Sequence, residues 1–326
     1  MAKPIISIIC LGLTGTSVGL GLQRVPGDFE IVGHDKDPEA AAAAKKAGAV
    51  NRTEWNLHRA YEGANLVVLA VPLNELDDLL GHMREGLRPD TLVLALTNIM
   101  QPAMTIADAQ LADTVHFVVG HPIVAGVGGM LTPRADLFDG ATFCLAPSLT
   151  TEPDAVELAS DLAERLGAKP FYVDAAEHDG IMAGVEQLPQ LVAAALMRMS
   201  ASSPSWSETK RLAGRAFAQA TELSGSGDQL YAALQTNRAS LVLRIDQLQR
   251  ELAEWKTMLE VEPVDGEDNP LLIQLREAVN EREHWAAQAE LKHWDGVAPA
   301  LEEVDGQPGF MRQLFLGGMF NRKPKE

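Results

Sequence analysis

The first forty residues constrain the fold of this chain more than any other part of it. An apolar run at 5–11 leads into the glycine-rich segment 12–19, and a second short apolar run ends at Asp35. This order is typical of a β-strand, a tight turn, an α-helix, a second strand and an acidic residue. In a dinucleotide-binding fold, such a turn brings a pyrophosphate to the N-terminus of the helix, where free N–H groups and the helix dipole favour anions. The pattern therefore predicts a Rossmann-type fold.

The acidic residue indicates which dinucleotide would bind. Asp35 lies 23 positions after Gly12, close to the spacing of about 20 at which a carboxylate holds a ribose 2′-hydroxyl. A carboxylate there repels a 2′-phosphate, so we expect NAD rather than NADP. The G-x-G-x-x-G pattern is incomplete because Cys10 replaces its first glycine, and a strand-to-helix turn without a cofactor is the alternative. The residues predicted to hold NAD are Gly12, Leu13, Thr14, Gly15, Thr16, Ser17, Asp35, Val71 and Pro72.

Strand and helix patterns alternate up to about residue 172, as a doubly wound α/β sheet requires. The run at 65–71 is continuously apolar, which is typical of a strand buried on both faces. The sequence thus predicts an NAD-binding Rossmann domain over 1–172. Its further expected strands are 29–34, 91–96, 115–119 and 141–145, and its expected helices are 38–47, 73–87 and 152–166.

After residue 175 the strand patterns vanish, which predicts an all-helical C-terminal domain over 173–300 and a tail over 301–326. Large apolar residues recur there at 4-3-4-3-4 spacing, the pattern of two packed long helices. They follow Leu234 and are Leu241, Ile245, Leu248, Leu252, Trp255 and Leu259. A second helix is expected after 263–270, so the pair would form an antiparallel hairpin. An intramolecular bundle would explain this seam, but its length favours a homodimer interface.

Composition narrows the functional class. A net charge of −18 and a pI near 4.8 argue against a nucleic-acid or anionic-membrane partner. The two cysteines are too few for a disulfide framework or a thiolate metal site, so we expect no metal and a reducing compartment. The chain runs from Met1 into its first strand without a signal-peptide pattern or a spanning segment. We therefore expect a cytoplasmic protein with a small-molecule substrate.

One histidine stands where chemistry is expected. His121, in the segment Gly120-His121-Pro122-Ile123, follows the strand at 115–119 and so lies at the carboxyl edge of the sheet, where open α/β folds bind ligands. A neutral imidazole there can accept a proton from a substrate hydroxyl while hydride leaves for a nicotinamide. The alternative is a histidine that only bonds a loop.

Five ordered segments, covering roughly residues 5 to 250, resemble the prephenate and arogenate dehydrogenases of tyrosine biosynthesis. They are 8–17, 63–72, 120–123, 136–140 and 177–180, the last followed by Leu188-Pro189. The resemblance implies an N-terminal NAD(P)-binding Rossmann domain, an all-helical dimer-forming domain and a site between them. It assigns proton acceptance from the substrate's ring hydroxyl to His121, and the aligned positions imply substrate contacts by His178 and Gln190.

Departures from the family pattern are equally specific. The family's D-x-x-S-x-K stretch corresponds to 95–100, where Asn98 takes the serine position and can still hydrogen-bond, but Met100 cannot replace the lysine. The family's L-P-H becomes Leu188-Pro189-Gln190, and F-R-D-x-T-R is lost around Phe217. Arg211, Arg215 and Arg238 are nearby in sequence, and Arg215 and Arg238 are the candidates to replace the missing arginine fork for a substrate carboxylate. The alternative is that each is an ordinary charge on a helix surface.

Three functions therefore stand open at the level of sequence. The first is NAD-dependent oxidative decarboxylation of prephenate or arogenate, and the second is a dehydrogenase of the same fold acting on another cyclohexadienyl or hydroxy acid. The third is a non-catalytic NAD-binding homologue. The presence of His121 favours an enzyme, whereas the missing arginine and lysine favour the third function.

Overall fold

The computed structural model describes residues 3–24, 27–124, 132–224, 226–262 and 269–291. These residues form two compact units, one that ends at Ala175 and one that begins at Ala176. The predicted tail at 301–326 lies outside the described residues, as do positions 125 and 126, which follow the histidine segment.

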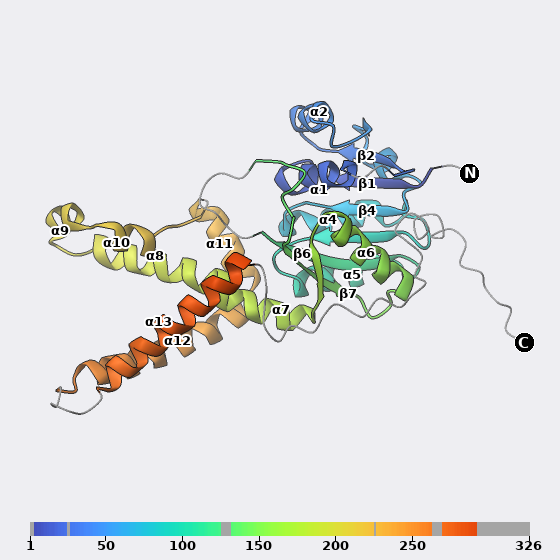
Figure 1. The fold of residues 1–326 in the computed structure, drawn as a ribbon. Helices are drawn as coiled ribbons and strands as arrows, with labels where there is room; N and C mark the ends of the chain where they lie inside the picture. Colours follow the sequence, from blue (N-terminus) through green and yellow to red (C-terminus); the bar gives the residue numbers. More distant parts are fainter. Residues whose placement is uncertain (1–2, 25–26, 125–131, 225, 263–268, 292–326) are drawn as a thin grey trace, which may run out of the picture. The chain divides into compact units, whose positions relative to one another are not determined.

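The first unit is built on an eight-stranded sheet (Figure 1) with the strand order β3-β2-β1-β4-β5-β6-β7-β8. Neighbouring strands run parallel, apart from the antiparallel pair β6–β7. All side chains of β4 are fully buried, as expected for a central parallel strand. The strands are β1 (Ile5–Ile9), β2 (Glu30–His34), β3 (Arg52–Thr53), β4 (Leu66–Leu69), β5 (Leu92–Leu96), β6 (His116–Ile123), β7 (Thr142–Pro147) and β8 (Lys169–Tyr172).

Helices cover both faces of this sheet, which makes it doubly wound. One face packs against α1 (Leu13–Gln23), α2 (Pro38–Lys46) and α6 (Pro153–Arg165). The opposite face packs against α3 (Leu57–Tyr61), α4 (Leu73–Met83) and α5 (Gln101–Gln110). The predicted Rossmann-type α/β class is confirmed.

The antiparallel strand β7 changes the end of β6. The pairing of β5 with β6 stops at Leu96 and Gly120, whereas the pairing of β6 with β7 continues to Ile123 and Thr142. The strand expected at 115–119 is therefore longer, because β7 supplies hydrogen-bond partners beyond the end of β5. As a result, His121 lies on the strand itself, just past the last residue that pairs with β5.

The edge strands β3 and β8 were not indicated by the sequence. β3 has two residues, and β8 is mostly exposed. Strands this short and this exposed show no continuous apolar run, which was the signal used for the other strands.

The second unit is helical, as predicted. It contains α7 (Ala175–Met182), which begins at the last residue of the first unit, then a π-helix (Ala183–Gln187), α8 (Leu188–Ala201), α9 (Trp206–Leu212), α10 (Arg215–Ala220), α11 (Gly227–Thr236), α12 (Arg238–Leu259) and α13 (Pro270–Leu291). The helices α12 and α13 lie side by side (Figure 1). Leu234, the first residue of the apolar series, lies on α11, because Asn237 separates α11 from α12.

One helical stretch, Ala175–Ala201, has the length and hydropathy of a membrane-crossing helix. It carries His178, Asp179 and Gln187, which are buried and hydrogen-bonded within the helical unit. A core helix of a protein that never meets a membrane passes the same length and hydropathy criteria, so the stretch is weak evidence for a membrane.

Candidate functional site

The turn after β1 contains a strained residue. Cys10 has φ of +72°, a left-handed conformation that costs a side-chain-bearing residue roughly 1 kcal/mol or more. Its N–H donates to the His34 carbonyl on β2 at 2.8 Å. Burial raises the pKa of the Cys10 thiol, so it stays protonated at neutral pH. The conformation explains why dinucleotide-binding turns favour glycine at this position.

Two glycines of the turn have different surroundings. A Cβ on Gly15 would lie 2.0 Å from the Cys10 carbonyl oxygen, so Gly15 is required for α1 to pack against the turn that follows β1. A Cβ on Gly12 would meet nothing within 4 Å. Gly12 is the N-cap of α1, and no side chain of the described residues caps the first-turn N–H groups. This is the arrangement that binds a phosphate anion.

Thr16 and Ser17 use their hydroxyl groups inside the protein. The Thr16 hydroxyl donates to the Leu11 carbonyl at 2.6 Å, and the Ser17 hydroxyl donates to the Leu13 carbonyl at 2.7 Å while accepting from the Arg134 N–H at 3.2 Å. Both side chains are buried. These two residues of the predicted cofactor set brace the turn, whereas Gly12, Leu13 and Thr14 are at least partly exposed at its open end.

Asp35 connects the turn to the end of β2. Its Oδ2 accepts from the Leu11 N–H at 2.6 Å, and its Oδ1 accepts from the Asp37 N–H at 2.8 Å. Asp35 also lines a pocket of about 460 Å³, together with residues of α2 and with Thr53, Glu54 and Trp55. A carboxylate held at this point fits a ribose diol and disfavours a 2′-phosphate.

Lys36, the nearest cation in sequence, already has a partner. Its ammonium group lies 2.7 and 2.8 Å from the two carboxylate oxygens of Glu75 on α4. The pair is exposed and so contributes little to stability. The Glu75 carboxylate nevertheless neutralises the Lys36 ammonium charge, which would otherwise attract a 2′-phosphate. Val71 and Pro72, also expected at the cofactor, follow β4, and Pro72 is the N-cap of α4.

His121 and Asn98 lie at the same edge of the sheet. Leu96 at the end of β5 is paired with Gly120, and the Thr97 N–H donates to the Gly120 carbonyl at 3.0 Å. Asn98 follows on the β5 side and His121 on the β6 side, both half-buried. Met100, at the position of the family lysine, is fully buried in the core. The chain thus presents a histidine and an amide here, with no cation at position 100.

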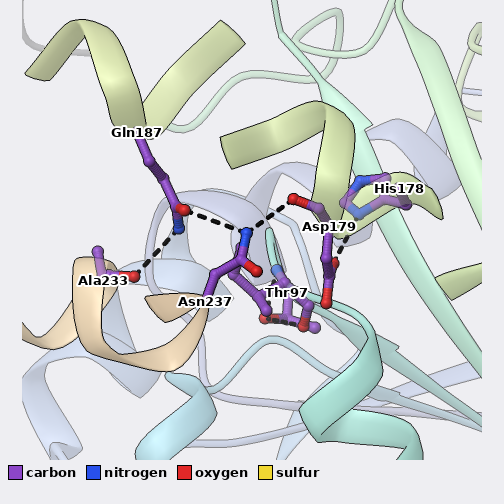
Figure 2. Close-up of polar contacts among 7 residues, drawn as sticks. Thr97, His178, Asp179, Gln187, Ala233 and Asn237 are labelled. Atoms are coloured by element: carbon purple, nitrogen blue, oxygen red, sulfur yellow. Dashed lines mark hydrogen bonds and ion pairs between the residues drawn. The ribbon is translucent and has the colours of Figure 1, made fainter. Parts of the chain in front are cut away.

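The helical unit contains a buried polar cluster (Figure 2). His178 Nδ1 lies 3.0 Å from Asp179 Oδ1. The Asn237 side-chain amide donates to the Asp179 carbonyl at 2.7 Å and to Gln187 Oε1 at 3.1 Å, and Gln187 Nε2 donates to the Ala233 carbonyl at 3.1 Å. Of these residues, sequence reasoning named only His178 as a site residue.

The remaining predicted substrate residues are not brought together. Gln190 Oε1 accepts from the Ser224 N–H at 2.9 Å and from its hydroxyl at 3.1 Å. Arg215 and Arg238 are exposed first residues of α10 and α12. Sequence reasoning missed Arg244, whose guanidinium donates from Nε and Nη2 to the Gly180 carbonyl at 3.1 and 2.9 Å. Within the described residues, no group of three or more His, Cys, Asp or Glu side chains is arranged to hold a metal ion.

Two family models match the chain in succession. Residues 18–172 match the nucleotide-binding domain of prephenate dehydrogenase, and residues 174–277 match its dimerization domain. The prephenate dehydrogenase of Bacillus subtilis is 26% identical over 268 residues, which cover 81% of this chain and 72% of that protein.

Solved structures share the fold. A prephenate dehydrogenase from A. aeolicus, in complex with hydroxyphenyl propionate and NAD+, has a TM-score of 0.72 at 20% identity and covers 90% of this chain and 98% of that one. The arogenate dehydrogenase of Synechocystis has a TM-score of 0.71 at 21% identity, with coverage of 86% and 99%. Because the two domain models together match most of its length, the chain belongs to the prephenate dehydrogenase family.

Proposed function

We propose that this protein is an NAD-dependent dehydrogenase that oxidatively decarboxylates prephenate or arogenate. The observation that carries the proposal is the carboxyl edge of the sheet. The uncapped N-terminus of α1 follows β1, the Asp35 carboxylate follows β2, and His121 lies at the end of β6.

The proposed cofactor is NAD. The first-turn N–H groups of α1 hold its pyrophosphate beside Gly12, and Asp35 binds the adenosine ribose. Val71 and Pro72, at the end of the neighbouring strand, line the same edge. When bound, NAD supplies an oxidised nicotinamide ring that accepts a hydride. The structure with NAD+ in the A. aeolicus relative supports this choice.

His121 is the proposed proton acceptor. As hydride leaves the substrate carbon that bears the ring hydroxyl, the neutral imidazole takes the hydroxyl proton and a carbonyl group forms. Loss of the ring carboxylate as CO2 then leaves an electron pair that makes the ring aromatic and turns the carbonyl oxygen into a phenolate, which takes the proton back from the His121 imidazolium to give a phenolic hydroxyl. Asn98 hydrogen-bonds the substrate hydroxyl or the imidazole and so orients the transfer.

The proposed substrate contacts come from the helical unit, through His178, Gln190, Arg215 and Arg238. We further propose that the protein is a cytoplasmic homodimer that associates through this unit, because residues 174–277 match the family's dimerization domain. The strongly acidic chain makes a local cation necessary for any substrate carboxylate. Arg215 and Arg238 are exposed, and we propose that they supply this cation.

The test is a turnover assay that offers prephenate and arogenate separately, together with calorimetric titrations of NAD and NADP. We expect NADH formation with one of the two substrates and tighter binding of NAD. Replacing His121 by Asn should lower the rate by roughly a hundred- to ten-thousand-fold and leave NAD affinity unchanged. His82→Asn, an exposed histidine change on α4, is the matched control.

A second function is favoured by the buried Met100 and the missing arginine motif, namely nucleotide binding without turnover. NAD binding with no product from either substrate would support that function. Turnover of a different cyclohexadienyl or hydroxy acid would support the proposed dehydrogenase activity but show that the substrate is a different one. A folded His121→Asn protein with normal turnover would remove the role proposed for this histidine.

A further inference from the structure

All of the buried polar and charged side chains described in the helical unit belong to one cluster. They are His178, Asp179, Gln187 and Asn237, each 2–7% exposed. Buried polar groups cost stability unless every one is hydrogen-bonded, and apolar residues of similar size would fill the same space without that cost. A satisfied cluster of this kind fixes one arrangement of its members.

The cluster is organised around an irregular turn of helix. The segment Ala183–Gln187 is a π-helix in which the Leu188 N–H bonds back to the Ala183 carbonyl, and such turns occur often at functional sites. Two consecutive carbonyls before it, those of Asp179 and Gly180, accept from the side chains of Asn237 and Arg244. Because Asn237 and Arg244 are seven residues apart, or about two turns, they reach the π-helix from one face of α12.

Asp179 in turn determines the state of the neighbouring imidazole. An ionised carboxylate only accepts hydrogen bonds, so the 3.0 Å contact between Asp179 Oδ1 and His178 Nδ1 places the proton of a neutral His178 on Nδ1. Nε2 is then the acceptor nitrogen. The Asp179 main chain is held by Asn237, which lies 58 residues away in sequence.

We propose that Asn237 is a positioning residue for His178. It fixes the backbone of Asp179, so that the Asp179 carboxylate keeps the His178 ring in one orientation and one tautomer, with the proton on Nδ1. Arg244 supports the same turn through Gly180. The inference rests on the proposed function, because it takes His178 as a substrate contact.

The decisive variants are Asn237→Ala, which removes the amide donor, and Leu241→Ala. Leu241 is a buried residue one turn along α12 that makes no polar contact with the cluster, so its truncation controls for lost packing. Gln187→Leu is a second control, because it removes a cluster member and leaves the bond from Asn237 to Asp179. All variants are measured as full chains saturated with NAD.

For Asn237→Ala we expect kcat to fall about ten- to a hundred-fold, as misplaced groups typically cause, with NAD affinity unchanged. Both controls should keep kcat within about threefold of the unmodified chain. Ring nitrogen NMR of 15N-histidine protein, with His178 assigned from the His178→Gln spectrum, should show one tautomer in the unmodified protein and both controls. Asn237→Ala should show a mixture.

A purely structural role predicts a different result. If Asn237→Ala loses no more activity than Leu241→Ala and keeps the His178 tautomer, the proposal is overturned. If the unmodified protein turns over neither prephenate nor arogenate, the proposed function fails but the NMR comparison still decides this inference. An unchanged tautomer in Asn237→Ala then overturns it, and a change confined to that variant supports it.

Discussion

At the scale of single residues, Gly12 and Gly15 illustrate how one motif combines two requirements. The absent Cβ of Gly15 lets α1 approach the backbone of Cys10, directly after β1. The absent Cβ of Gly12, in contrast, leaves space that no atom of the described residues enters within 4 Å. We therefore expect a side chain at position 15 to disturb the fold, and a side chain at position 12 to disturb ligand binding.

This difference gives a matched pair of predictions. Gly15→Ala should destabilise the protein by at least about 2 kcal/mol, because its Cβ clashes with a backbone oxygen that cannot rotate away. Gly12→Ala should change stability by less than about 1 kcal/mol and weaken NAD binding at least tenfold. Thermal unfolding and calorimetric titration measure the two effects. Equal loss of stability in both variants would contradict the assignment.

At the scale of elements, helix α6 carries an aspartate, Asp161, whose buried carboxylate destabilises the packed helix when it is charged. One carboxylate oxygen of Asp161 is buried without a hydrogen-bond partner among the described residues, as is one of Glu157. Burial, with added repulsion from Glu157 and Glu164, raises the pKa of Asp161 to about 6. The folded protein therefore binds this proton more tightly than the unfolded chain, whose aspartate titrates near 3.9.

The contribution of Asp161 to the free energy of unfolding should consequently increase as the pH falls from about 6 towards 4, since protonation removes the buried charge. Asp161→Asn should stabilise the protein at pH values above 6 by about 1 kcal/mol, and the gain should shrink towards pH 4. Denaturant unfolding across this pH range measures it. Asp154→Asn, an exposed change of the same charge on α6, should show no such gain, and an equal gain there would argue against the burial effect.

At the scale of the whole molecule, the described residues cover the long seam of α12 only in part. Leu241 is buried and Ile245 and Leu248 are half-buried, but Leu252 and Leu259 are 59% and 68% exposed. α13 also carries exposed apolar side chains, among them Val279 and Trp285. These apolar side chains lie within the helical unit, most of which matches the family's dimerization domain. Exposed apolar side chains in such a unit favour a homodimer in which a second copy of the chain packs against them.

Leu252→Glu should therefore dissociate the proposed dimer without unfolding the subunit, because Leu252 is exposed in the single chain but would become a buried charge in the dimer. Sedimentation velocity at micromolar concentration measures this change. Leu149→Glu, at a fully exposed position of the first unit, should leave the assembly unchanged. A monomeric unmodified protein would refute the homodimer.

The sequence predicted those features of this protein that depend on residues close to one another in the chain. Local spacing was enough to predict the alternation of apolar strands and helices and the strand that leads to His121. It was also enough to predict the turn at Gly12 and the acidic residue Asp35. Each of these signals occurs within about 25 residues, and its side-chain periodicity is visible without knowledge of any partner.

Only the tertiary structure decided the features that depend on contacts between distant segments. β6 is extended past Gly120 because the antiparallel β7 pairs with it, and Ser17 is tied to Arg134 across 117 residues. Asn237 is a polar residue between Leu234 and Leu241 in an otherwise apolar series. The sequence shows this polar residue, but it does not show that its hydrogen-bond partner is Asp179, which lies in another helix. Pattern determines which segments form helices and strands, but register and long-range hydrogen bonds arise only when the folded chain brings distant backbone groups together.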